Sequence, residues 1–179
     1  MESNGFIDPI FTHQIELDVD RLLDKCYKYR QSCIDASSVE EPMGGWIRTG
    51  SSTSKQYYGF KDEEFSEKIS KLVKEQHTID YPVRLQAAWL NINHPKDSNN
   101  VHEHTGGVQF LSGVYYLKVP KDSGDIQFYN HLREKVSSIS PKENMVILFP
   151  CGVLHGVEEN NSSEDRISIA FNIQRRSDG

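Results

Sequence analysis

The chain has few of the features that mark membrane, secreted or metal-cluster proteins. None of its apolar runs approaches the roughly 20 residues that a membrane-spanning helix needs. Its three cysteines, Cys26, Cys33 and Cys151, lack the close spacing of a zinc motif, which favours a reducing compartment over a disulfide framework. The first residues contain neither a basic n-region nor an apolar h-region, so we expect no signal peptide and a cytoplasmic location.

The chain also has no excess of basic residues. Its 20 Lys and Arg are outnumbered by 26 Asp and Glu, for a net charge of −6, and no basic stripe runs along the sequence. Binding to nucleic acid depends on neutralising phosphates, so this composition disfavours that class of partner. We expect a small-molecule or peptide partner and no membrane association, and the sequence leaves the oligomeric state open.

The composition is that of one globular domain. At 179 residues the chain can bury a single core, so we predict one domain over 1–179, with helices and a lid loop in 1–80 and a β core in 81–176. Apolar stripes predict helices at 18–30 and 62–76, the second capped by Asp62. Between them, 37–60 is rich in turn formers and has no sustained period, which predicts a long loop or a loop with a short strand. Four of its residues are possible substrate contacts: Trp46, Arg48, Tyr57 and Tyr58.

Beyond residue 82 the sequence changes to short runs rich in Val, Ile, Tyr and Phe, separated by Gly, Pro, Asn and Asp. No helical period interrupts them, which favours a sandwich, jelly roll or barrel over a parallel sheet. The predicted fold is therefore mainly β with N-terminal helices (α+β), a double-stranded β-helix (jelly roll) covered by two helices. The predicted strands are 83–93, 101–104, 109–119, 125–129, 136–139, 145–149, 153–158 and 166–173.

Histidines supply the first sign of chemistry. His102 and His104 stand two apart in a predicted strand, where residues i and i+2 point to the same face, so both can reach one ion while Glu103 faces away. His155 follows a Pro-x-Gly turn and opens another predicted strand. The three histidines are therefore candidate metal ligands. The alternative is that they are surface histidines near strand ends.

An alternating strand supplies the second sign. The segment RISIAFN at 166–172 places three apolar residues on one face and Arg166, Ser168, Ala170 and Asn172 on the other. A guanidinium inside a β fold needs an anion, and the carboxylate of a ligand would satisfy it, with the Ser168 hydroxyl as a further donor. A salt bridge to Glu158 or Asp125 is the alternative.

Together these segments resemble a known family. His-x-His at 102–104, FLSGVYYLKVP at 110–120, LFP at 148–150, LHGV at 154–157 and RISIAFN at 166–172 occur in the order found in Fe(II)/2-oxoglutarate-dependent oxygenases. The resemblance covers about 85–173 and is to a group found in bacteria and phages. It implies that His102 and His155 bind Fe(II), that Arg166 and Ser168 bind the distal carboxylate of 2-oxoglutarate, and that O2 is the second cosubstrate.

The resemblance also assigns Tyr116 to that carboxylate, because the Tyr-Tyr-Leu run looks like a strand of prolyl hydroxylases. His104 departs from the superfamily, in which Asp or Glu usually completes two histidines and one carboxylate. A three-histidine site is the first interpretation, because the bacterial and phage group shares the His-x-His. A carboxylate from Glu103 or Asp125 is the second, and loss of catalysis is the third.

The expected reaction is hydroxylation of a C–H bond in a peptide, prolyl residue or small molecule. Asn91 and Asn93 share a strand face with Trp89, so they are candidates to hydrogen-bond 2-oxoglutarate or the substrate, or simply the fold. Two alternatives stay open. One is a three-histidine cupin that does not use 2-oxoglutarate, although the glutamate of the cupin motif is replaced by Val108. The other is a non-catalytic jelly-roll module that binds zinc or no metal.

Overall fold

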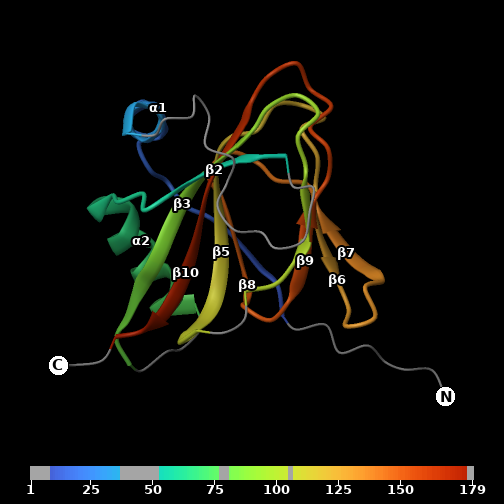
Figure 1. Ribbon diagram of the computed structural model, residues 1–179. Helices are drawn as coiled ribbons and strands as arrows, with labels where there is room; N and C mark the ends of the chain where they lie inside the picture. Colours follow the sequence, from blue (N-terminus) through green and yellow to red (C-terminus); the bar gives the residue numbers. More distant parts are fainter. Residues whose placement is uncertain (1–8, 37–52, 77–80, 105–106, 177–179) are drawn as a thin grey trace.

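The computed structural model describes residues 9–36, 53–76, 81–104 and 107–176 of the chain. Two helices, α1 (Val19–Ala36) and α2 (Glu63–Gln76), lie on one side of two antiparallel sheets (Figure 1). The strands are β1 (Phe11–Gln14), β2 (Lys55–Tyr58), β3 (Val83–Asn93), β4 (Asn99–His102), β5 (Gln109–Lys118), β6 (Ile126–Tyr129), β7 (Lys135–Ile139), β8 (Met145–Pro150), β9 (Leu154–Val157) and β10 (Arg166–Arg175). Among the described residues, no helix is long and apolar enough to cross a membrane.

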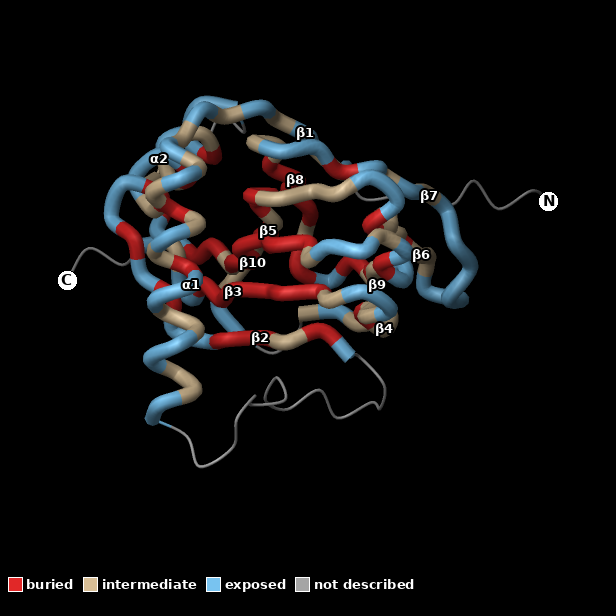
Figure 2. The backbone as a smooth tube through the Cα atoms, turned by 90° about the horizontal axis from the view of Figure 1, so that it is seen from above, coloured by how far each residue is buried: buried red, intermediate tan, exposed pale blue. Residues whose placement is uncertain are grey.

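The sheets form the two layers of a jelly roll. The larger has the strand order β1-β8-β5-β10-β3-β2 and the smaller the order β4-β9-β6-β7. Strands that are distant in sequence are therefore neighbours, as in the pairing of β10 with both β3 and β5. Seen from above, the buried residues concentrate on the middle strands of the larger sheet, with the helices on one side and the smaller sheet on the other (Figure 2). The predicted fold class is confirmed.

The helices cover the outer face of the larger sheet. Phe65 of α2 packs edge-on against Phe171 of β10, with ring centroids 5.7 Å apart. Gly113 of β5 permits this packing, because a Cβ there would lie 2.4 Å from the Phe171 ring. The cap predicted at Asp62 is present, since its carboxylate accepts from the Phe65 N–H at 2.9 Å. Arg21 of α1 donates to the same carboxylate, which ties the two helices together.

The predicted element boundaries need three corrections. Helix α1 extends six residues beyond the predicted end at Arg30, to Ala36. The strand predicted at 101–104 is Asn99–His102, so Glu103 and His104 follow the strand instead of lying in it. Strand β1 has no counterpart among the predicted strands, and β2 is the short strand that the sequence allows within 37–60 without giving its bounds. Each has four residues and forms only by pairing with β8 and β3, respectively. Strand β2 falls in the predicted loop 37–60, of which 37–52 lies outside the described residues.

Candidate metal centre and adjoining pocket

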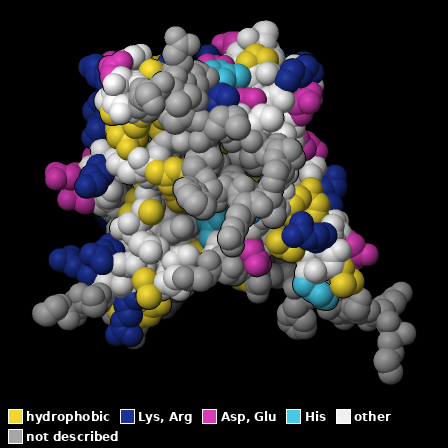
Figure 3. Space-filling model, viewed as in Figure 1, with side chains coloured by type: hydrophobic (Ala, Val, Ile, Leu, Met, Phe, Trp, Pro, Cys, Tyr) yellow, Lys and Arg dark blue, Asp and Glu magenta, His cyan; other side chains and the backbone are white. Residues whose placement is uncertain are grey.

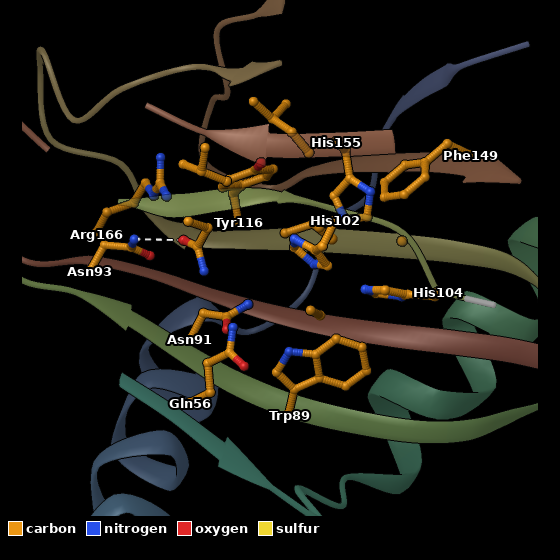
Figure 4. A pocket seen from close by; sticks show the side chains of 16 residues that line it. Gln56, Trp89, Asn91, Asn93, His102, His104, Tyr116, Phe149, His155 and Arg166 are labelled. Carbon is orange, nitrogen blue, oxygen red and sulfur yellow. Dashed lines mark hydrogen bonds between the residues drawn. The ribbon is translucent and has the colours of Figure 1, made fainter. Parts of the chain in front are cut away.

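The three candidate histidines meet between the two sheets. His102 ends β4, His155 lies opposite it on β9, and His104 follows two residues after His102. One ring nitrogen from each can be chosen so that all lie within 4.8 Å of one another. Two ligands at about 2.1 Å from a common metal are at most about 4.2 Å apart, so modest ring rotations close the group around one ion. Figure 4 shows the three imidazoles at one end of a pocket.

Hydrogen bonds orient all three imidazoles. The Nδ1 of His102 lies 2.7 Å from the Asn100 carbonyl, and the Nδ1 of His155 lies 2.9 Å from the Val153 carbonyl. A carbonyl only accepts, so each Nδ1 must carry the proton and each Nε2 keeps its lone pair. His104 Nδ1 lies 3.0 Å from the side-chain oxygen of Asn172 and 3.0 Å from the Ser112 hydroxyl. All three Nε2 atoms are therefore available as ligands, the arrangement that metal-binding imidazoles require.

Burial favours the neutral form of these imidazoles. It lowers the pKa of His102 and of His104 below the ordinary value, and that of His155 falls well below it, with the other two histidines adding to the effect. Neutral imidazole is the form that binds a metal. Phe149 packs against His155 with ring centroids 4.6 Å apart and shields that side of the centre.

No carboxylate joins the cluster among the described residues. Glu103 is exposed, and the Asp125 carboxylate accepts a hydrogen bond from Ser138 at 3.0 Å. Neither side chain lines the pocket. Of the interpretations left open by the sequence, the geometry brings together the three-histidine set and not a set completed by Glu103 or Asp125.

The opposite end of the pocket is formed by Arg166. This residue opens β10 and is only 2% exposed, and one terminal nitrogen donates to the carbonyls of Ser123 and Gly124 at 3.0 Å each. Gly124 has a positive φ of 88°, and a Cβ there would lie 2.6 Å from the Glu158 carbonyl, so the turn requires glycine. Burial lowers the pKa of Arg166, and its Nε has no hydrogen-bond partner.

The salt bridge considered as an alternative for Arg166 is not formed. Within the described ranges, no carboxylate pairs with its guanidinium, and Glu158 instead contacts the Asp125 N–H at 3.3 Å. A buried guanidinium with an unpaired Nε is an electrostatic cost that an anionic ligand would offset. The arginine end of the pocket thus fits a carboxylate.

Tyr116 lies between the two ends of the pocket, near Arg166 (Figure 4). It is 1% exposed, and burial raises its pKa to about 12, so the phenol stays protonated and able to donate. Its neighbour Tyr115 faces the helices, packing against Phe65 and donating to the Asn144 side chain at 2.8 Å. Ser168 is buried on the pocket face of β10, opposite Tyr116, but it does not itself line the cavity.

Side chains of β2, β3 and β4 form the remaining wall of the pocket. Asn93 donates to the Asn99 side chain at 2.8 Å, so its amide nitrogen is already used within the fold. Asn91 is 9% exposed, and its side-chain oxygen has no partner. The pocket contains about 460 Å³ of space not filled by atoms, part of it open to solvent. In the space-filling view, histidine reaches the surface near the centre of this face (Figure 3).

The four residues proposed as substrate contacts have different positions in the structure. Trp46 and Arg48 lie outside the described residues. Tyr57 is 2% exposed and belongs to the core beneath the helices, so it faces away from the pocket. Tyr58 is 48% exposed and stacks on Trp89, which lines the pocket, with ring centroids 5.5 Å apart.

Three polar residues of the site were missed by the sequence analysis: Gln56, Asn99 and Ser112. Gln56 lies on β2, whose bounds the sequence does not give, and Asn99 precedes the predicted start of β4, so neither has a strand period to place it. Ser112 could have been found, because it has the same parity as Tyr116 in β5 and therefore faces the same side.

An antiparallel jelly roll with three clustered histidines and a buried arginine is compatible with a non-haem metal oxygenase, and comparisons with known proteins point to the same class. A family model described as "Putative 2OG-Fe(II) oxygenase" matches residues 87–172. The matched segment contains all three histidines and Arg166, and the name of the family gives Fe(II) and 2-oxoglutarate as its cofactor and cosubstrate. No curated protein sequence matches the chain.

Solved structures with the same fold are distant in sequence. A prolyl-4-hydroxylase from Pseudomonas putida is 14% identical with a TM-score of 0.67, and the alignment covers 94% of each chain. The carbocyclase SnoK from nogalamycin biosynthesis is 15% identical with a TM-score of 0.71, covering 94% of this chain and 80% of that one. HygX from Streptomyces hygroscopicus, solved with nickel and 2-oxoglutarate, is 11% identical with a TM-score of 0.61, covering 95% and 84%.

Proposed function

We propose that the protein is an iron(II)- and 2-oxoglutarate-dependent oxygenase in which His102, His104 and His155 bind the metal. The observation that carries the proposal is that one pocket has a metal-binding group at one end and an anion-binding group at the other. One end offers three oriented, neutral imidazoles, and the other offers a buried guanidinium whose Nε is unpaired. A dicarboxylate with a keto acid group at one end matches both. The family match also disfavours the cupin alternative.

Each residue of the pocket has a defined part in this proposal. Arg166 binds the distal carboxylate of 2-oxoglutarate, with the Tyr116 and Ser168 hydroxyls as further donors. Asn91 offers an unpaired acceptor, while Asn93 supports β4 through Asn99. When bound, Fe(II) and 2-oxoglutarate supply the oxidising chemistry with O2, yielding succinate and carbon dioxide. The protein positions the reacting carbon and excludes water.

Hydroxylation of a C–H bond is the reaction that we propose, on a peptide, a prolyl residue or a small molecule. One similar structure is a prolyl-4-hydroxylase and another is a carbocyclase, so the fold alone does not select the substrate. The cysteines are free thiols, which supports a reducing compartment such as the cytoplasm of a bacterium or a phage-infected cell.

The experiment is reconstitution with Fe(II) under anaerobic conditions, followed by O2 and 2-oxoglutarate and measurement of succinate. We expect the wild type to form succinate, and His155→Ala and Arg166→Ala to fall to the level without protein. His131→Ala and Arg84→Ala are matched controls, because both residues are exposed and neither lines the pocket, and they should retain turnover. Equal background in all five proteins would reject the proposal and favour a non-catalytic binding module.

A further inference from the structure

His104 is held differently from the other two imidazoles. His102 and His155 each bond a backbone carbonyl two residues earlier in the chain, an acceptor that no substitution removes. His104 lies beyond the end of β4, and its Nδ1 is bonded by side chains from β10 and β5, Asn172 and Ser112. The orientation of the His104 imidazole therefore depends on side chains, which substitution can remove.

The contacts around His104 form a closed network. The Ser112 hydroxyl donates to the side-chain oxygen of Asn172 at 2.8 Å, and its oxygen lies 3.0 Å from His104 Nδ1. It also lies 3.2 Å from the Cys151 sulfur, and the Cys151 carbonyl accepts from the His104 N–H at 2.8 Å. Ser112 and Cys151 are 1% and 6% exposed, so water competes little for these bonds. Both the backbone and the ring of His104 are fixed by this network.

The chemistry of the network selects one tautomer. The Asn172 oxygen and the Ser112 oxygen both accept, so His104 Nδ1 must carry the proton and Nε2 must present its lone pair to the centre. An imidazole lacking this support would be free to turn its ring or to carry the proton on Nε2, and either change removes a ligand. Residues behind metal-binding histidines generally act in this way, and their loss weakens metal binding.

We propose that Asn172 and Ser112 are positioning residues that make His104 the third metal ligand. This inference rests on the proposed three-histidine centre. Asn172 is the main acceptor, because its oxygen contacts both the imidazole and the serine hydroxyl. Ser112 orients the Asn172 oxygen and adds a second contact. The network explains how an imidazole is held at a position that follows the strand end.

The test is titration of the metal-free protein with Co(II), followed by the visible absorption of the bound ion. Asn172→Leu keeps the size of the side chain but removes the acceptor, and we expect Co(II) binding to weaken by about 10- to 100-fold. Asn172→Asp keeps an acceptor oxygen and should bind Co(II) within about three-fold of the wild type. Gln174→Met is the control, since Gln174 is a buried amide of the same strand that bonds exposed Arg84 outside the pocket.

A double-mutant cycle separates positioning from general damage. If Asn172 acts through His104, then His104→Ala weakens Co(II) binding, and adding Asn172→Leu to it causes no further loss. Additive losses, or an Asn172→Leu protein that binds as the wild type does, would overturn the inference. A His104→Ala protein that binds as tightly as the wild type would instead reject the three-histidine centre itself. Thermal unfolding of each metal-free variant verifies that it is folded.

Discussion

The two faces of strand β10 bury different chemistry. Toward the helices, Ile167, Ile169 and Phe171 are fully buried in an apolar cluster. Toward the smaller sheet, Arg166 lines a pocket of histidines and amides, and Asn172 contacts His104, one of those histidines. Alternate residues of this strand therefore serve different purposes, one set packing the core and the other facing the site. Substitutions on the first face should change stability, and substitutions on the second should change ligand binding.

The largest expected effect is on the helix face. Phe171→Ala removes a ring that packs against Phe65 and over Gly113, so we expect a loss of about 3–5 kcal/mol in the free energy of unfolding. Denaturant titration of the metal-free protein measures it. A loss below about 1 kcal/mol would mean that this face does not dominate stability.

Substitution on the pocket face should instead change ligand binding. Arg166→Met keeps much of the side-chain volume and removes the charge, and we expect 2-oxoglutarate to bind the metal-loaded protein about 100-fold more weakly. Anaerobic calorimetry measures the affinity, with Arg84→Met as the control on an exposed arginine. An unchanged affinity of Arg166→Met for 2-oxoglutarate would show that Arg166 does not bind the distal carboxylate.

The link between the helices should depend on pH. Arg21 first, and then Lys25 and the Phe65 N–H, hold the pKa of Asp62 below its unfolded value of 3.8. The folded state therefore binds fewer protons than the unfolded state in acid, and the stabilisation is complete above about pH 4 and lost as the pH falls further. Asp62→Asn should cost about 1–2 kcal/mol at neutral pH.

That cost should shrink toward zero in acid, where the wild-type carboxyl is itself protonated. Urea titrations of both proteins at a series of pH values measure the difference between their free energies of unfolding. A difference that stays constant down to the acid range would show that the carboxylate charge does not stabilise the helix contact.

The smallest effects come from the adjacent tyrosines, which test the two faces with the same substitution. Tyr116→Phe should weaken 2-oxoglutarate binding by about five-fold and leave stability unchanged, because its hydroxyl belongs to the pocket. Tyr115→Phe should lower stability by about 1 kcal/mol and leave binding unchanged, because its hydroxyl bonds Asn144. The opposite pattern would contradict the division between the faces.

Much of this division could be predicted from sequence because it is local. The alternation of RISIAFN placed Arg166, Ser168 and Asn172 on one face, and the apolar stripe of 62–76 placed α2 against the sheet. Periods of two and of 3.6 residues are properties of neighbouring residues, so the sequence expresses them directly. The resemblance added the convergence of His155 with the His-x-His, which no local pattern contains.

What the sequence did not predict depends on contacts between distant segments. Strands β1 and β2 are too short to show a period, and only their pairing partners stabilise them. Gln56 and Asn99 were missed for this reason. The position of His104 beyond the end of β4, and its support by Ser112 and Asn172, follow from how three separate segments meet.

The most direct test of the central claim is a crystal structure of the protein loaded anaerobically with Fe(II) and 2-oxoglutarate, using anomalous scattering to locate the iron. We expect one iron bound by the Nε2 atoms of His102, His104 and His155, with the distal carboxylate of 2-oxoglutarate paired to Arg166. An iron bound without His104, or a carboxylate that does not contact Arg166, would contradict it.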